Sequence, residues 1–325
     1  MMRNMLTKTA LLCSGGLLLL SLLLQSCATS ELHSTPAVQS YQNPHSGVFV
    51  SDENSDPALT VMTLNIAHGR GDSFHQLLQR SDTTLANLET IATLFKTTDA
   101  DVIALQEADG PSFWSGNFDH VEYLANQASF GHSVRGAHVD GIGLSYGTAL
   151  LANLELQDAQ AITFDPSLSP VPKGFVVSTI RWPGMPCVDI DVVSIHLDFA
   201  SESVRRKQAM ELIETLHARN RPLIIMGDLN SEWQLQNSSV QYLSQELALS
   251  AYGPERADLD TFPAFGERLD WILVSPELKF RSYRVLADVV SDHRGVVAEL
   301  VLDNATRASA AQDSCSLVKA DEPLS

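Results

Sequence analysis

A short polar motif that follows an apolar run is the most informative feature of this chain. The run Leu223-Ile224-Ile225-Met226 ends in Gly227, and Asp228 and Asn230 follow, two residues apart. Alternate residues of an extended chain point to the same side, so both side chains are expected to face one point in space. A carboxylate that accepts a proton from water, next to an amide that holds an oxyanion, is suited to hydrolysis.

Polar residues close other apolar runs of the sequence in the same way. The ends of strands converge on one rim of a sheet, where ligand sites usually form. Each residue alone is also compatible with a turn or a strand end, but their joint occurrence favours a site. The residues are Asn65, Glu107, His196, Asp270, Asp292 and His293.

Together with Asp228 and Asn230, this set holds two histidines, four carboxylates and two carboxamides. It contains no cysteine and too few clustered histidines for a structural zinc site. Carboxylate oxygens and retained waters are the ligands that Mg²⁺ and Mn²⁺ prefer. The set therefore predicts acid–base chemistry assisted by Mg²⁺ or Mn²⁺.

In their order along the chain, these motifs resemble the endonuclease/exonuclease/phosphatase superfamily. The resemblance spans about residues 59–302 and includes Thr261-Phe262-Pro263 ahead of Leu269-Asp270. It implies an α/β fold, a four-layered α/β/β/α sandwich with two mixed, mainly antiparallel sheets. It also implies a metal-dependent phosphoesterase, in a group that includes deoxyribonucleases, sphingomyelinases and inositol polyphosphate phosphatases.

The resemblance also implies which residues bind the metal and act on water. Glu107 would be the main metal ligand, with Asn65 beside it, and Asp292 would complete the metal and water shell. Asp228 would orient or deprotonate the attacking water. Asn230 would hold a phosphoryl oxygen.

The two histidines have implied roles at the phosphate. His293 would contact the scissile phosphate, with Asp270 fixing its tautomer and raising its basicity. His196 would hydrogen-bond the phosphate or assist the leaving group. Phosphoester hydrolysis needs an activated water in line, neutralised charge and help for the leaving oxygen, and these groups supply each part without a covalent intermediate.

Other residues are weaker candidates. A substrate-binding role and a purely structural one are both compatible with Thr148, Asn117 and Trp114. The helical sequence Arg205-Arg206-Lys207-Gln208 is expected to be mainly structural. Four further histidines are expected in loops or at the surface, and they are His68, His75, His132 and His138. His68 stands close to Asn65, so whether a second metal binds there stays open.

Helical and strand-like patterns alternate from residue 58 to residue 303, which predicts one α/β domain with more than one sheet. The 3.6-residue apolar period predicts helices, which are 84–97, 119–128, 201–219 and 240–247. Short apolar or alternating runs predict strands, which are 58–66, 101–106, 147–152, 157–164, 175–182, 187–197, 221–227, 269–274, 280–287 and 296–302.

The two ends of the chain differ from this domain. Residues 1–26 hold a charged start and an apolar run, and Leu24-Gln25-Ser26-Cys27 resembles a bacterial lipobox with Cys27 as the lipidated residue. Ala28 then favours the outer membrane, while an ordinary signal peptide or an uncleaved anchor are the alternatives. Residues 27–57 predict a flexible tether and 304–325 a disordered tail.

The formal net charge is −18, and it becomes about −20 without Arg3 and Lys8 of the predicted signal peptide. Such a surface repels polyanions, so a stable nucleic-acid complex is not expected. We expect a monomer, tethered in the cell envelope, that acts on a lipid headgroup or a small phosphoester. The alternatives are a periplasmic or surface nuclease and a non-catalytic lipoprotein of the same fold.

Overall fold

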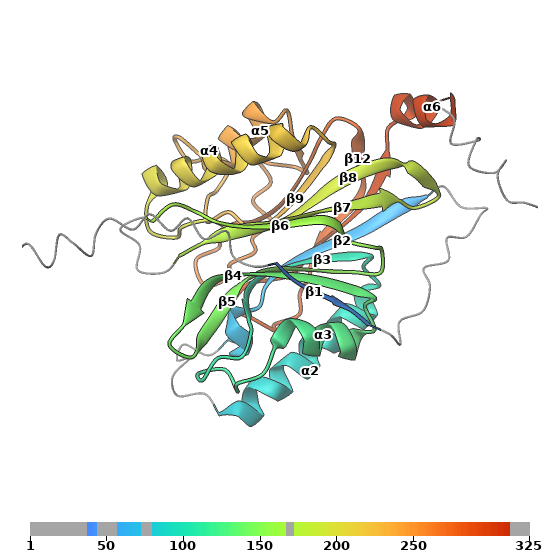
Figure 1. Ribbon diagram of the computed structural model, residues 1–325. Helices are drawn as coiled ribbons and strands as arrows, with labels where there is room; N and C mark the ends of the chain where they lie inside the picture. Colours follow the sequence, from blue (N-terminus) through green and yellow to red (C-terminus); the bar gives the residue numbers. More distant parts are fainter. Residues whose placement is uncertain (1–37, 44–56, 73–79, 167–171, 313–325) are drawn as a thin grey trace, which may run out of the picture. The chain divides into compact units, whose positions relative to one another are not determined.

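Two β-sheets pack face to face, and helices cover the outer side of each (Figure 1). The computed structural model describes residues 38–43, 57–72, 80–166 and 172–312. The predicted signal peptide, Cys27 and His75 lie outside the described residues. Within the described part, the predicted α/β sandwich with two mixed sheets is confirmed.

The first sheet has seven strands among the described residues, in the order β1-β4-β5-β3-β2-β13-β12. Strands β2 and β3 run parallel, and every other printed neighbour pair in this sheet is antiparallel. Its strands are β1 (Val38–Gln42), β2 (Ala58–Asn65), β3 (Val102–Asp109), β4 (His132–Gly141), β5 (Leu144–Ala152), β12 (Leu278–Val285) and β13 (Val296–Leu302).

The second sheet has six strands among the described residues, in the order β10-β11-β9-β8-β7-β6. Its one parallel pair is β8 with β9. Its strands are β6 (Gln157–Thr163), β7 (Gly174–Trp182), β8 (Met185–His196), β9 (Leu223–Asp228), β10 (Ser250–Ala251) and β11 (Asp270–Val274).

Three apolar layers separate the four layers of the fold. Side chains such as Leu59 and Ile224 fill the space between the sheets. Leu88 of α2 (Ser81–Thr98) and Leu124 of α3 (His120–Ala128) pack on the first sheet. Helices α4 (Glu202–Arg219) and α5 (Ser239–Glu246) pack on the second sheet, as Leu212 and Leu243 show. Burial of these faces is the main stabilising contribution.

Polar contacts tie the two sheets together near the carboxyl ends of β3 and β8. Gln106 Nε2 donates to Ser194 Oγ at 3.1 Å, and Ser194 Oγ donates to the carbonyl of Leu105 at 2.8 Å. All of these groups are buried, so each needs its partner. The contacts fix how the strand ends of one sheet meet those of the other.

The predicted tether and tail are wrong at two places within the described residues. Val38 to Gln42 forms edge strand β1, which pairs antiparallel with β4, because an edge strand needs backbone partners more than apolar side chains. Asn304–Gln312 forms α6, where Asp303 accepts the backbone N–H of Thr306 at 2.8 Å and caps an alanine-rich helix.

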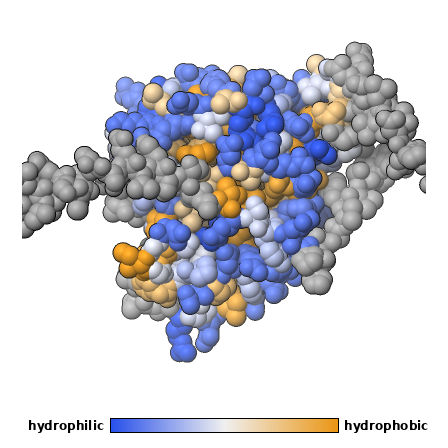
Figure 2. Space-filling model, viewed as in Figure 1, coloured by the Kyte–Doolittle hydropathy of each residue, from blue (hydrophilic) through white to orange (hydrophobic). Residues whose placement is uncertain are grey.

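The surface shown in Figure 2 is mostly hydrophilic, with hydrophobic residues in small separate groups. Among the described residues, no helix has the length and the apolar content needed to cross a membrane.

Candidate active site

Three adjacent strands of the second sheet place His196, Asp228 and Asp270 side by side. His196 is the register partner of Asp228 across the parallel pair β8–β9, and Asp270 is its partner across the antiparallel pair β9–β11. Register partners point to the same face of a sheet, so the three side chains line up in a row. The next residue back, Gly227, has no room for a side chain, because a Cβ there would lie 2.0 Å from the carbonyl oxygen of Ile195.

Asp228 is the centre of this row and also contacts the first sheet. Asn65, the last residue of β2, donates its amide to Asp228 Oδ2 at 3.1 Å, and the N–H of Asn230 donates to Asp228 Oδ1 at 3.0 Å. His196 Nε2 lies 3.4 Å from Oδ2. Burial, together with the nearby Asp270, outweighs the attraction of His293 and raises the pKa of Asp228 to about 7. A carboxylate with this pKa accepts a proton readily near neutral pH.

Asp270 holds His293 in place. His293 Nδ1 donates to Asp270 Oδ2 at 2.8 Å, and the Thr261 hydroxyl donates to the same oxygen at 2.7 Å. Burial of His293 favours the neutral ring, but Asp270 and then Asp228 outweigh it and raise its pKa to about 10. His293 is therefore an imidazolium, and its Nε2 lies 3.8 Å from Asp228 Oδ2.

Glu107 is aimed at the site by a β-bulge. The pairing of β3 with β5 shifts between Leu105 and Ala108, and Glu107 has a φ of 51°. Bulges of this kind redirect a side chain at a strand end. Burial alone would raise the pKa of Glu107, but His68, Lys173 and Arg70 lower it well below its usual range. Glu107 therefore stays ionised.

Arg70 lies between two of the predicted metal ligands. Its guanidinium contacts Asp292, and its NH1 lies 3.5 Å from Glu107 Oε2. His68 lies on the other side, with Nε2 3.3 Å from Glu107 Oε2 and Nδ1 2.6 Å from Asp109 Oδ1. Burial opposes a charge on His68, but Glu107 and Asp109 raise its pKa.

Lys173 stands at the start of β7, next to His196. Its Nζ lies 3.0 Å from Nε2 and 3.1 Å from Nδ1 of His196, and 3.8 Å from Glu107 Oε1. Burial and then Lys173 lower the pKa of His196 well below 6.5, so its ring is neutral. A neutral ring can accept a hydrogen bond from Lys173 at one nitrogen and donate to Asp228 from the other.

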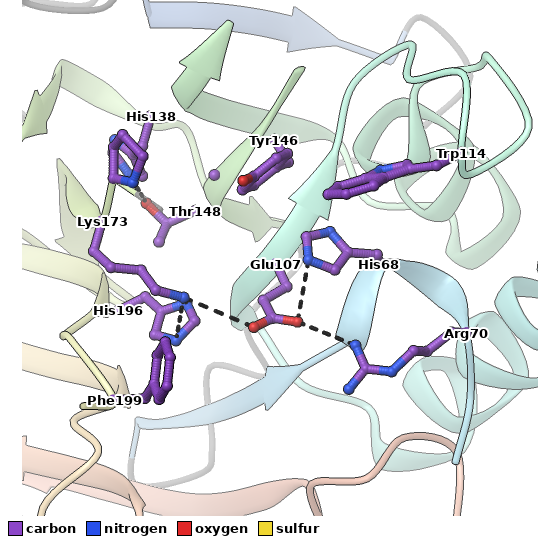
Figure 3. A pocket seen from close by; sticks show the side chains of 12 residues that line it. His68, Arg70, Glu107, Trp114, His138, Tyr146, Thr148, Lys173, His196 and Phe199 are labelled. Atoms are coloured by element: carbon purple, nitrogen blue, oxygen red, sulfur yellow. Dashed lines mark hydrogen bonds and ion pairs between the residues drawn. The ribbon is translucent and has the colours of Figure 1, made fainter. Parts of the chain in front are cut away.

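These residues line two neighbouring cavities. The acidic cavity, of about 440 Å³, is lined by Asp228, Asn230, Asp292 and His293 among others. The basic cavity, of about 290 Å³, is lined by His68, Arg70, Trp114, Tyr146, Thr148 and His138 among others (Figure 3). Glu107, Lys173, His196 and Phe199 line both.

The structure brings most of the predicted site residues together. The eight residues Asn65, Glu107, His196, Asp228, Asn230, Asp270, Asp292 and His293 meet where the two sheets adjoin, with Asp270 behind His293. Trp114 and Thr148 line the basic cavity. Asn117 is exposed in the loop before α3 and is not among the residues lining either cavity.

Several residues of the site were not anticipated. His68 and His138 were expected in loops or at the surface, yet His68 contacts Glu107 and His138 is buried on β4, 2.9 Å from Thr148 Oγ1. His68 and Arg70 follow Asn65 so closely that their spacing could have indicated them. Lys173 is a lone lysine before a strand, and nothing in its sequence neighbourhood marks it.

The helical sequence at Arg205 is structural, as expected. Arg205 NH1 donates to the carbonyl of Asp198 at 3.0 Å, and Gln208 Oε1 accepts the backbone N–H of Asp198 at 2.8 Å. These bonds hold the loop that follows His196.

The chain matches the model of the Endonuclease/Exonuclease/phosphatase family over residues 62–293. Similar solved structures include an endonuclease/exonuclease/phosphatase from Beutenbergia cavernae DSM 12333, with 19% identity and a TM-score of 0.60 over 76% of this chain and 72% of that one. A mannosyl-6-phosphatase from Bacteroides thetaiotaomicron has 18% identity and a TM-score of 0.58, over 75% of this chain and all of that one.

The catalytic domain of human Nocturnin, with bound sulfate, has 19% identity and a TM-score of 0.58, over 83% of this chain and all of that one. At such identities these likenesses show the fold. No curated protein sequence matches the chain.

Proposed function

Because the chain belongs to the endonuclease/exonuclease/phosphatase family, we propose that it is an enzyme that hydrolyses phosphoesters with the help of a divalent cation. One observation carries the proposal. Asp228, buried and with a pKa near 7, is in contact with an amide from the first sheet and with His196 of the second. A poised base, two histidines and a cluster of carboxylates in one cavity are the parts that this chemistry needs.

The carboxylates fit a divalent cation. Glu107 and Asp292 both contact Arg70, so they converge on one positive charge, and Glu107 remains ionised. Asn65 lines the same cavity. These three residues would hold Mg²⁺ or Mn²⁺, which prefer oxygen ligands. When bound, the cation would supply positive charge to the phosphoryl oxygens and the leaving oxygen.

A second cluster could hold a cation. The possible ligand atoms of Asp228, Asp270 and His293 all lie within 4.8 Å of one another. Asp270 and His293 hydrogen-bond to each other, however, which favours acid–base work at this point. We therefore place the cation at Glu107 and Asp292 and keep this group for proton transfer.

The chain's own residues supply the remaining steps. Asp228 takes the proton from the attacking water. The amide of Asn230 has two N–H donors, of which the bond to the Leu197 carbonyl uses one, and the other donates to a phosphoryl oxygen.

Three further side chains act on the charge of the transition state. Lys173 neutralises charge on the phosphoryl group, and His196, next to it, hydrogen-bonds the same group. His293, held by Asp270 and positively charged, stabilises the negative charge that develops.

The substrate we propose is a small phosphoester or a lipid headgroup, bound by a monomer anchored through Cys27 in the cell envelope. The net charge of −18 supports this choice over a long nucleic acid, which such a surface repels. A structure of the same fold is a mannosyl-6-phosphatase, in keeping with a small substrate. The anchor rests on the sequence Leu24-Gln25-Ser26-Cys27, since these residues lie outside the described part.

The proposal is tested with the full chain in detergent, with Mg²⁺ or with EDTA. Sugar phosphates, inositol phosphates, phosphatidylinositol vesicles, plasmid DNA and RNA are offered in parallel. Asp228→Asn should reduce the rate on the best substrate by at least about 10²-fold, whereas Asp189→Asn, an exposed carboxylate on β8, should not. Normal turnover by Asp228→Asn would overturn the proposed site. Cleavage of DNA or RNA alone would overturn the substrate class.

A further inference from the structure

The basic cavity is continuous with the place where the phosphoryl group would bind. Glu107, Lys173 and His196, shown in the basic cavity in Figure 3, also line the acidic cavity, so a molecule held at these residues reaches into each. Asp228 lines only the acidic cavity. The two cavities therefore adjoin at the shared residues.

The two cavities also differ in the charged side chains that line them. Four carboxylates line the acidic cavity, Glu107, Asp228, Glu267 and Asp292. Among the described residues that line the basic cavity, Glu107 is the one carboxylate, and it faces Arg70 and Lys173. His138 adds no charge, because burial and then Lys173 lower its pKa to about 3. Arg70 and Lys173 present N–H donors to this cavity, and such donors suit an anionic guest.

Aromatic rings form one wall of the basic cavity. Trp114 and Tyr146 lie 5.4 Å apart, and His68 lies 5.1 Å from Trp114 and 4.9 Å from Tyr146. Trp114 is fixed by a bond from its Nε1 to Asp109 Oδ2 at 2.8 Å. On the inner side, buried Thr148 is held by His138 at 2.9 Å. A fixed aromatic wall with a hydroxyl at the inner end suits a compact ring that carries polar groups.

The direction of the reaction decides which part of the substrate lies there. Attacking and leaving oxygens are roughly in line in phosphoryl transfer. Because Asp228 would act on the water within the acidic cavity, the adjoining basic cavity is the space that remains for the leaving group.

We propose that the basic cavity is the leaving-group subsite and takes a polyol or sugar ring that carries a second anionic group, held by Arg70 against the wall at Trp114. The inference rests on the proposed function and deepens it. A guanidinium has five N–H donors, so Arg70 can hold its carboxylate partners and an anion together. The volume of about 290 Å³ fits one such ring, free in solution or borne on a lipid.

The test compares substrates that differ in one phosphate. The full chain with Mg²⁺ is given glucose 1,6-bisphosphate, glucose 1-phosphate, glucose 6-phosphate and p-nitrophenyl phosphate, and phosphate release is measured. A second arm uses vesicles that contain phosphatidylinositol 4,5-bisphosphate. We expect kcat/KM for the bisphosphate to exceed that for each glucose monophosphate by about 10- to 100-fold, the range of a hydrogen bond between charged groups.

Variants of the cavity make the test specific. Arg70→Gln should reduce this ratio to within about threefold of one, and Arg70→Lys should restore part of it. The ratio compares two substrates on one protein, so a general loss of stability or metal affinity cancels. Phe113→Ala is the matched control: Phe113 is 63% exposed beside Trp114, does not line the cavity, and should leave the ratio unchanged.

The outcomes separate the subsite from the proposed function. A ratio that Arg70→Gln abolishes supports the subsite, and the vesicle arm then shows whether the ring is free or lipid-borne. Hydrolysis of p-nitrophenyl phosphate with no preference for the bisphosphate, or with a preference that Arg70→Gln leaves intact, overturns the subsite alone. No phosphate release from any substrate overturns the proposed function, and the subsite with it.

Discussion

Replacing Asp270 by Asn removes the charge that holds the His293 imidazolium, and the size of the effect follows from the structure. Burial opposes the charged ring, but Asp270 and Asp228 raise the pKa of His293 from 6.5 to about 10. At about 1.4 kcal/mol per pKa unit, the site stabilises the imidazolium by about 5 kcal/mol. A nearby opposite charge accounts for about 1–3 units, so Asp270→Asn should lower the pKa of His293 by that amount.

The same change should alter stability in a pH-dependent way. Because the pKa of His293 is higher in the folded protein than in the unfolded chain, its protonation stabilises the fold. This stabilisation is fully present below pH 6.5, the unfolded pKa, and is lost as the pH rises through about 10. At pH 6, Asp270→Asn should therefore lower the free energy of unfolding by about 1–4 kcal/mol through this linkage. The linked difference should vanish above pH 10.

Three measurements check this reasoning. An NMR titration of the His293 ring in metal-free protein reports its pKa. Urea unfolding across the pH range reports how the free energy of unfolding depends on pH. Turnover of the best substrate reports kcat, which should fall by about 10²-fold or more. Asp258→Asn, which removes an exposed carboxylate paired with Arg256, is the control. An unchanged pKa of His293, or a stability loss of equal size at every pH, would refute the argument.

Two other substitutions test the metal site and the sheet. Glu107→Gln should abolish the rise in Tm that Mg²⁺ gives over EDTA. The control Glu246→Gln changes an exposed residue on α5 and should keep this rise. If Glu107→Gln also keeps it, Glu107 is not a metal ligand. Gly227→Ala should lower the free energy of unfolding by more than about 2 kcal/mol, because its Cβ meets the Ile195 carbonyl at 2.0 Å. Gly141→Ala shares the positive φ but has open space, so equal losses in urea unfolding would contradict this steric explanation.

The sequence carried most of the fold because its strands and helices have clear apolar patterns. The strand expected at 221–227 is β9, Leu223–Asp228, and the helix expected at 201–219 is α4, Glu202–Arg219. The site residues could be found because they stand at the ends of these strands, where polar groups interrupt an apolar run. Their order along the chain then pointed to one family.

Other elements of the fold and one site residue have no such apolar pattern around them. Strand β4 went unpredicted because the polar residues Arg135 and His138, which it also buries, interrupt its apolar pattern. Arg135 reaches Asp119 at 3.2 Å and the hydroxyl of Ser145 at 3.1 Å, and such partners become known only from the fold. Lys173 is missed for the same reason, since its position next to His196 comes from the pairing of β7 with β8.

The order in which the strands enter the sheets has a consequence for synthesis. The chain builds β1 to β5, leaves for the whole second sheet, and returns only with β12 and β13. His293 lies just before β13, and β13 supplies the antiparallel partner of β2. A nascent chain therefore has neither its last histidine nor a covered edge on β2 until almost all of the domain has left the ribosome. Until then the site lacks His293, and an unpaired edge of β2 is open to pairing with another chain.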